Sequence, residues 1–126
     1  IDCDVIEADG GTRTAAITGA YVALALAVKK LLKKGILTQN PIKDSISAIS
    51  CGIVNGKILV DLDFSEDSRA DVDANFVFTQ KSGVSEVQIS GEKSTFSLKT
   101  INQMLKLSLK STEKISRLQE KVIGKI

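Results

Sequence analysis

The sequence has 126 residues, 43% of them hydrophobic, which is enough for one domain with a core and too few to expect two. Its 17 basic and 15 acidic residues give a net charge of +2, so global charge does not argue for a nucleic-acid or membrane partner. Histidine is absent, which excludes mechanisms that need an imidazole from this chain. Two cysteines far apart in sequence supply no ligand set for structural zinc, whereas hard cations held by carboxylates remain open.

The cysteines and the N-terminal charges bear on the cellular compartment. Cys3 and Cys51 each lie among strand-like apolar residues, so we expect reduced core thiols in a cytoplasmic protein rather than a disulfide. The acidic N-terminus is unlike a signal peptide. The uncharged run from Ala15 to Val28 is shorter than the roughly 20 residues of a membrane span. We therefore expect a buried core helix there and no membrane partner.

A strand, a glycine turn and a helix are predicted in direct succession at the start of the chain. Residues 1–6 alternate apolar and polar side chains, as a half-buried strand does, and Asp9-Gly10-Gly11 is a turn signal. Residues 14–34 are rich in alanine and leucine, with lysines at the C-terminal end where they suit the helix dipole. Gly35 ends this predicted helix.

Two strand pairs follow. The Asn55-Gly56 dipeptide is a strong hairpin signal and joins predicted strands at residues 47–54 and 57–62. The strand pattern returns at residues 74–79 and 84–90.

The end of the chain is predicted to be an amphipathic helix from Ser97, a plausible N-cap, to about Val122. Its apolar residues recur at helical spacing: Leu98, Ile101, Leu105, Leu109, Ile115, Leu118 and Val122. The whole pattern predicts a single α+β domain over residues 1–126, with helices packed on a mostly antiparallel sheet.

The glycine turn is a candidate anion site. Gly10 and Gly11 let backbone N–H groups approach a ligand closely, and a helix N-terminus adds unpaired donors and positive potential. Thr12 offers a hydroxyl, and Arg13 offers a charged planar fork suited to phosphate oxygens. The spacing matches neither a Walker loop nor a dinucleotide fingerprint. The alternative is a tight turn in which Arg13 pairs with a nearby carboxylate.

An acidic cluster is a candidate cation site. It comprises Asp61, Asp63, Glu66, Asp67, Asp71 and Asp73. Asp67 and Asp73 are placed to converge on one Mg²⁺ or Mn²⁺, which would neutralise charge on a phosphodiester. An EF-hand is excluded, because the sixth position of such a loop would be Glu66 rather than glycine. The alternative is that these acids simply face water, with Arg69 balancing some of them.

Basic residues on the last predicted helix recur at spacings of three and four: Lys106, Lys110, Lys114, Arg117 and Lys121. They form one stripe opposite the apolar face. Such a stripe either attracts an RNA backbone or is an ordinary solvated helix face. Aromatic residues suited to stacking on bases are scarce, so sequence-specific base reading is not supported.

Four segments together resemble the ribonuclease PH family of phosphorolytic 3′ exoribonucleases, and specifically its C-terminal half. They are residues 1–14 (IDCDVIEADGGTRT), 17–23 (ITGAYVA), 48–63 (AISCGIVNGKILVDLD) and 66–75 (EDSRADVDAN). The ADGGTRT and EDSxAxxDxN motifs are specific in combination. The resemblance implies a fold like ribosomal protein S5 domain 2.

The same resemblance implies a site and a reaction. Gly11, Thr12 and Arg13 would bind inorganic phosphate, Asp67 and Asp73 would hold magnesium, and Arg13 with the two aspartates would be catalytic. Phosphate would attack the 3′-terminal phosphodiester of RNA and release a nucleoside diphosphate. This tRNA nucleotidyltransferase activity would trim RNA 3′ ends, including those of tRNA precursors.

The family assembles as a hexameric ring, and its N-terminal half has no counterpart in this chain. We therefore expect a missing half or companion chain, an open sheet edge at Ile1 and an uncovered apolar face. One alternative function is a non-catalytic, RNA-binding ring subunit of an exosome-like assembly, against which the retained Thr12, Arg13, Asp67 and Asp73 argue. Another is a hydrolytic nuclease, which would release monophosphates.

Overall fold

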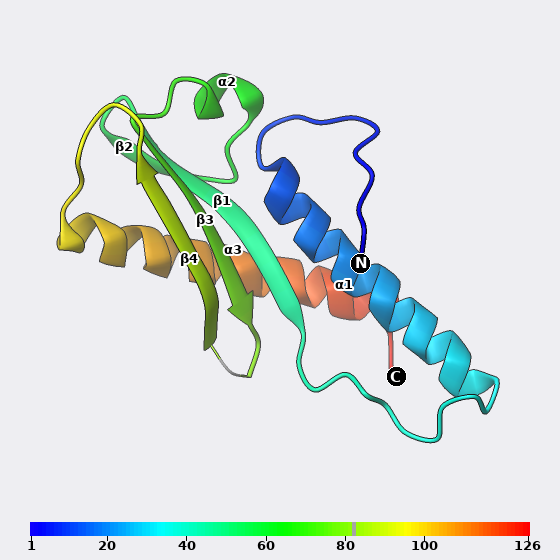
Figure 1. Cartoon of the computed structure of the whole chain (residues 1–126). Helices are drawn as coiled ribbons and strands as arrows, with labels where there is room; N and C mark the ends of the chain where they lie inside the picture. The colour runs from blue at the N-terminus through cyan, green and yellow to red at the C-terminus, as the bar shows by residue number, and fades with distance from the viewer. Residues whose placement is uncertain (82) are drawn as a thin grey trace.

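A computed structural model of the chain describes residues 1–81 and 83–126 (Figure 1). It contains three helices and four strands: α1 (Thr12–Lys33), β1 (Ile46–Val54), β2 (Lys57–Val60), α2 (Phe64–Asp67), β3 (Val72–Thr79), β4 (Gly83–Gly91) and α3 (Leu98–Ile123). The strands form one sheet in the order β2-β1-β3-β4, in which every neighbouring pair is antiparallel. The predicted α+β class and antiparallel sheet are confirmed.

The hairpin between β1 and β2 forms as predicted. Asn55 and Gly56 have φ angles of 52° and 72°, which asparagine and glycine adopt more readily than other residues. β2 pairs only with residues 51–54 of β1, so the first half of β1 has β3 on one side and α1 on the other. There the Thr18 hydroxyl of α1 accepts from the Ala48 N–H at 3.0 Å and donates to the Ala48 carbonyl at 3.3 Å. The helix thus takes the place of a neighbouring strand at this edge.

The main core lies between α3 and one face of the sheet (Figure 1). Its fully buried residues are Cys51, Val72, Ala74, Phe76, Phe78 and Met104. The four on β3 are every second residue of that strand, so they share the face that α3 covers. α3 begins as predicted, with the Ser97 side chain accepting from the Thr100 N–H.

The buried face of α3 differs from the predicted one. Its buried residues are Met104, Ser108, Thr112, Ser116, Gln119 and Ile123, four of them polar. Leu98, Leu118 and Val122 were expected on the buried face but are 80%, 63% and 64% exposed. Small side chains at the centre of the contact let the helix lie close to the sheet, and the leucines fall on the flanks of that contact.

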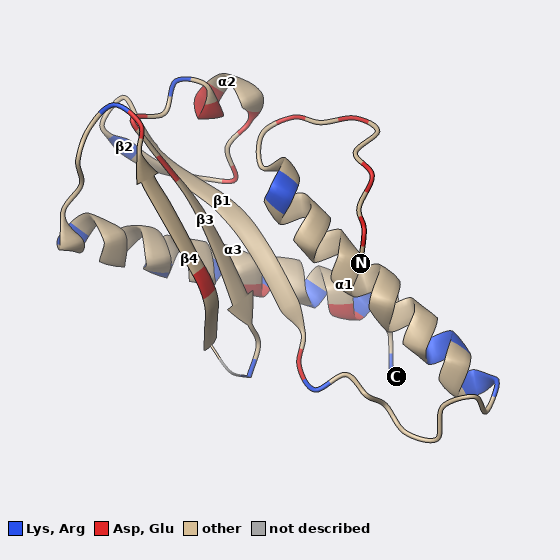
Figure 2. Ribbon diagram, viewed as in Figure 1, with Lys and Arg blue, Asp and Glu red and all other residues tan. Residues whose placement is uncertain are grey.

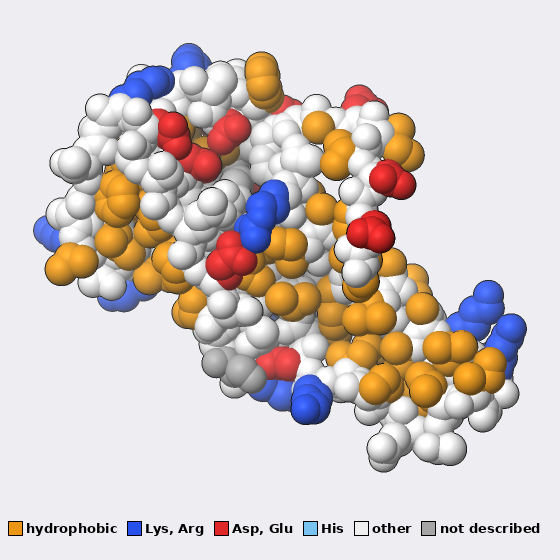
Figure 3. Space-filling model, viewed as in Figure 1, with side chains coloured by type: hydrophobic (Ala, Val, Ile, Leu, Met, Phe, Trp, Pro, Cys, Tyr) orange, Lys and Arg blue, Asp and Glu red, His pale blue; other side chains and the backbone are white. Residues whose placement is uncertain are grey.

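The prediction of a buried core helix at residues 15–28 is wrong for this chain. Only Thr14, Ala25 and Val28 of α1 are buried, and Leu24 and Leu26 are 42% and 43% exposed. Hydrophobic side chains gather over α1 in Figure 3. By length and composition alone α1 also qualifies as a membrane-spanning helix, with 11% of its most apolar window buried, but core helices of soluble proteins pass the same test.

The predicted N-terminal strand is also wrong. Although the structure describes all of residues 1–9, it assigns them no strand, and every one of them is exposed. Alternation alone does not make a strand, which needs a second strand to pair its backbone groups. The segment instead runs back along α1 and encloses with its alanine-rich face a hollow of about 670 Å³. Cys3 is therefore exposed, contrary to prediction, whereas Cys51 is a buried free thiol as predicted.

Candidate active site

The glycine turn packs against the backbone that follows β2. A Cβ on Gly10 would lie 2.1 Å from the Leu62 carbonyl oxygen, so only glycine allows this approach. Gly11 has a φ of 68° and is the N-cap of α1. The close approach that Gly10 allows in this structure is to the chain itself, and the approach of the glycine N–H groups to a ligand stays a prediction.

The turn is also tied to α2, which ends at Asp67. Asp9 Oδ1 accepts from the Phe64 N–H at 2.7 Å, at the first residue of that helix. Asp63 caps α2, because its side chain accepts from the Glu66 N–H while the Glu66 side chain accepts from the Asp63 N–H. The predicted phosphate turn and one predicted metal ligand are thus neighbours in the fold.

The N-terminus of α1 carries no side-chain cap. The Thr12 hydroxyl donates to the Asp9 carbonyl at 2.9 Å, and the Thr14 hydroxyl donates to the Gly11 carbonyl at 2.9 Å. Both hydroxyls thus satisfy carbonyls, which leaves the first backbone N–H groups of the helix to other acceptors. Such groups, together with the helix dipole, suit an anion.

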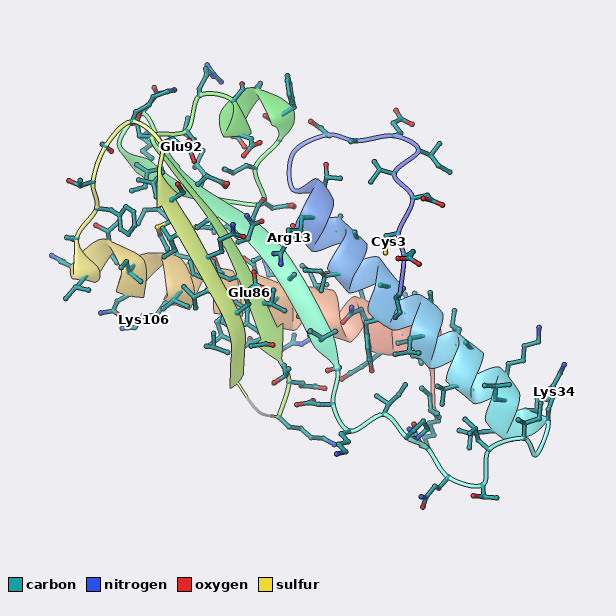
Figure 4. The ribbon with its side chains drawn as sticks, viewed as in Figure 1. Cys3, Arg13, Lys34, Glu86, Glu92 and Lys106 are labelled. Carbon is teal, nitrogen blue, oxygen red and sulfur yellow. The ribbon has the colours of Figure 1, made fainter. Side chains whose placement is uncertain are left out.

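Arg13 does not point into empty solvent. Its Nη2 lies 3.0 Å from Glu86 Oε2 and 2.9 Å from Glu86 Oε1, and both side chains are about half exposed. Figure 4 shows the two side chains meeting across the sheet, one from the start of α1 and the other from β4. The alternative in which Arg13 pairs with a carboxylate is therefore realised in this structure.

Asp67 and Asp73 line one hollow of about 320 Å³, together with Ser68, Ala70, Glu92 and Lys93. Burial raises the pKa of Asp73, and the neighbouring Asp67 and Glu92 carboxylates raise it further. Figure 2 shows several acidic residues, coloured red on the ribbon, near this end of the sheet. The sequence prediction that these two aspartates converge is thus consistent with the geometry.

The donor set suits a hard cation, which would offset the burial and the neighbouring negative charges that raise the pKa of Asp73. Within residues 1–81 and 83–126, no group of three or more acidic, histidine or cysteine side chains is arranged to hold a metal. A magnesium ion bound by Asp67 and Asp73 would therefore take its remaining ligands from water and substrate oxygens, as magnesium commonly does.

The turn and the acidic hollow lie on one face of the sheet. Asp73 and Val77 point to the same side of β3, and Glu86 pairs with Val77 across to β4. Four residues along a strand separate Asp73 from Val77, a distance of about 13 Å. Figure 3 shows a basic side chain between two groups of acidic side chains on this face. The residues that line the acidic hollow do not include Arg13, so the two parts are neighbours rather than one cavity.

The basic stripe of α3 lies elsewhere. All five of its residues are exposed, and α3 covers the opposite face of the sheet from Asp73 and Glu86. The stripe is therefore an outer helix face, separated from the candidate site by the sheet.

Sequence reasoning missed Asp9, Glu86, Glu92 and Lys93. Asp9 could have been suspected from its position directly before the glycines. Glu86, Gln88 and Ser90 alternate along β4, which predicts a polar face of the strand. The alternation does not predict that Glu86 contacts Arg13. Glu92 and Lys93 directly follow β4, and their sequence context matches no known ligand motif.

Comparison with known proteins gives a consistent result. A profile of the 3′ exoribonuclease family, domain 2, matches residues 44–111, more than half of the chain. Ribonuclease PH from Cereibacter sphaeroides (strain KD131) is 49% identical over 124 residues, which is 98% of this chain and 52% of that protein. The chain therefore spans about half the length of this relative and corresponds to its C-terminal part.

Solved structures share the fold. Rrp46 from rice (Oryza sativa) has a TM-score of 0.74 at 22% identity, over 96% of this chain and 52% of that one. An Archaeoglobus fulgidus exosome with RNA bound to the active site has a TM-score of 0.66 at 21% identity, over 89% of this chain and 44% of that one. The predicted fold class is confirmed. The chain belongs to the 3′ exoribonuclease family.

Proposed function

We propose that the protein containing this chain is a phosphate-dependent 3′-to-5′ exoribonuclease that shortens RNA and releases nucleoside diphosphates. The observation that carries the proposal is the arrangement of the uncapped α1 N-terminus with Arg13 beside α2, on the sheet face that also bears Asp73. The 49% identity to a ribonuclease PH supports the same reaction.

Inorganic phosphate would bind at Gly11, Thr12 and Arg13. The first backbone N–H groups of α1 would hold one part of the anion, and the guanidinium of Arg13 would hold another. Held there, a phosphate oxygen attacks the phosphorus of the last phosphodiester. The bond from that phosphorus to the 3′ oxygen of the preceding nucleotide breaks, and this oxygen takes up a proton. Positioning and charge neutralisation, rather than a protein nucleophile, carry the catalysis.

Asp67 and Asp73 would hold Mg²⁺ or Mn²⁺ beside the reacting phosphodiester. When bound, the ion supplies neutralisation of negative charge on the phosphate oxygens. The hollow that these aspartates line also contains Lys93, whose Nζ donates to the Arg69 carbonyl at 3.2 Å. Lys93 thus lines the hollow, where its charge would also favour an RNA phosphate.

The substrate would be the 3′ end of RNA, including tRNA precursors, in the cytoplasm. The relative's name, ribonuclease PH, supports RNA as the substrate class. Scarce aromatic residues fit an enzyme that holds the RNA backbone and removes any nucleotide in turn.

The complete protein would contain an N-terminal half or companion chain and assemble into a ring, which we propose to be hexameric. The exposed apolar residues of α1 and the hollow beneath residues 1–9 are a surface that such a half would cover. Structural likeness to an archaeal exosome core, with a TM-score of 0.52 at 25% identity over 66% of this chain and 32% of that one, supports a multi-subunit assembly.

The proposal is tested with the purified complete protein and an RNA that carries a 3′ extension. With Mg²⁺ and inorganic phosphate we expect nucleoside diphosphates, and without phosphate none. Asp73→Ala and Arg13→Ala should each lower the rate by about 100-fold or more. Lys110→Gln, on the outer face of α3, is the matched charge-removing control and should leave the rate unchanged. Monophosphates formed without phosphate would show a hydrolytic nuclease, and RNA binding without any product would support a non-catalytic ring subunit.

A further inference from the structure

The ion pair between Arg13 and Glu86 joins elements 73 positions apart in the sequence. A single guanidinium nitrogen, Nη2, contacts both carboxylate oxygens of Glu86, at 2.9 and 3.0 Å. A guanidinium has five N–H donors. In the described part of the chain, Nε and Nη1 of Arg13 have no other partner, so one edge of the fork stays available for phosphate oxygens.

Glu86 is the acidic residue on the middle of this sheet face. Between it and Asp73, the residues of the same parity are Val77 and Asn75 on β3 and Gln88 and Ser90 on β4, and all are uncharged. The next carboxylates along the face are those of the acidic hollow, with Asp67, Asp73 and Glu92. A guanidinium released from Glu86 would be attracted toward that hollow, where it would compete with a cation for the same carboxylates.

The pair contributes little to the fold, because ion pairs between half-exposed side chains add little net stability. Its effect is on the direction of the Arg13 side chain. A long side chain loses considerable rotamer freedom when it binds a ligand, and a partner that already fixes it reduces that loss.

We propose that Glu86 is a positioning residue: it holds the Arg13 guanidinium over the sheet, with one edge directed to phosphate, and keeps it away from the Asp67 and Asp73 carboxylates. This inference rests on the proposed phosphate site and adds the residue that prepares it. Glu86 itself need not touch phosphate or RNA.

The test measures phosphate dependence of RNA shortening by the complete protein and its variants. Glu86→Ala should raise the KM for phosphate by roughly tenfold, with kcat at saturating phosphate and Mg²⁺ within about twofold of wild type. Glu86→Gln keeps the size and one acceptor oxygen but loses the charge. Its KM for phosphate should therefore lie between those of the wild type and Glu86→Ala. Glu86→Ala should also raise the Mg²⁺ concentration needed for half-maximal rate, because Arg13 is then free to move toward the aspartates.

A double-variant cycle gives the decisive comparison. If Glu86 acts through Arg13, Arg13→Ala with Glu86→Ala should have the same phosphate KM as Arg13→Ala alone. Lys110→Gln is again the control, and equal melting temperatures exclude a loss of fold.

The outcomes separate the two proposals. Should Arg13→Ala lower the rate of phosphorolysis by about 100-fold while Glu86→Ala leaves or lowers the KM for phosphate, the proposed function stands and the positioning role is overturned. Additive effects in the double variant would likewise overturn it. A wild-type protein without phosphate-dependent activity would overturn both.

Discussion

The carboxylate of Asp9 accepts two backbone hydrogen bonds through one oxygen, from the neighbouring Gly10 N–H at 2.9 Å and from the Phe64 N–H at 2.7 Å. The second bond spans 55 positions of sequence and links the turn before α1 to the start of α2. The two motifs that define the candidate site are therefore held together by a side chain that belongs to neither set of proposed ligands.

Replacing Asp9 with alanine should loosen this link. We expect the free energy of unfolding to fall by about 1 kcal/mol, the usual net value of such a bond. The rate of RNA shortening should fall more steeply than stability, because Arg13 and Asp67 lose their fixed relation. Asp9→Asn keeps an acceptor oxygen and should restore most of the rate. Asp4→Ala, in the same exposed segment, is the control, and equal rates for Asp4→Ala and Asp9→Ala would contradict the prediction.

Asp73 should make stability depend on pH in a defined direction. Its pKa in the folded protein is raised above the value of 3.8 by burial first and then by Asp67 and Glu92. The folded state therefore holds this proton more tightly than the unfolded chain, so stability falls as pH rises from 3.8 through the folded pKa. At pH values above the folded pKa, the charged Asp73 lowers the stability of the fold by its full amount.

Asp73→Asn should consequently melt at a higher temperature than wild type at pH 7 without metal, and the difference should shrink toward pH 3. Added Mg²⁺ should raise the melting temperature of the wild type and have less effect on the variant, because a ligand stabilises the state that binds it. Thermal unfolding followed by circular dichroism measures both. A variant less stable than wild type at pH 7 would show that burial does not penalise the Asp73 charge.

Local sequence signals located most elements, because those elements depend on nearby residues. Residues within a few positions of each element determine the Asn55-Gly56 turn, the Ser97 cap and the two long helices, α1 and α3. The strand expected at residues 1–6 did not form, because pairing depends on a partner that alternation cannot supply. The buried face of α3 was predicted wrongly for a related reason. The face depends on contact with the sheet, where small polar residues of α3 lie closest, and helical spacing of apolar residues does not show that contact.

The site divides in the same way. Arg13, Asp67 and Asp73 were predicted from motifs, and the two aspartates do line one hollow. Glu86 was not predicted, because its contact with Arg13 depends on strand register and joins residues 73 positions apart. Residue type and spacing suggested ligands, whereas the residues that hold those ligands in place required the tertiary structure.

The two cysteines should differ sharply in reactivity. Cys51 is fully buried, and burial raises the pKa of its thiol to about 11, so almost no thiolate is present at pH 8. Cys3 is exposed. In the chain of residues 1–126, iodoacetamide should therefore modify Cys3 alone, and Cys51 should react only after unfolding in guanidinium chloride. Intact mass gives the number of labels, and Cys3→Ser should remain unlabelled when native. Rapid labelling of native Cys51 would contradict the burial of this core.

Gln119 connects three elements of the fold. Its Nε2 donates to the Thr18 carbonyl of α1 at 2.9 Å and to the Ile46 carbonyl of β1 at 3.1 Å, from a position on α3 that is 4% exposed. Its Oε1 is buried and has no hydrogen-bond partner within the described residues, so the amide nitrogen alone holds the side chain.

Gln119→Leu would leave two carbonyls without this donor in a buried place, and the free energy of unfolding should fall by about 2 kcal/mol. Gln103→Leu is the matched control, because Gln103 is exposed on the same helix and its replacement should change stability by less than about 0.5 kcal/mol. Urea unfolding of both variants measures the difference. Because one of the lost bonds joins α3 to Thr18 in the first half of α1, Gln119→Leu should also speed amide exchange in that part of the helix. Equal stabilities for the two variants would mean that the Gln119 hydrogen bonds add no net stability to the fold.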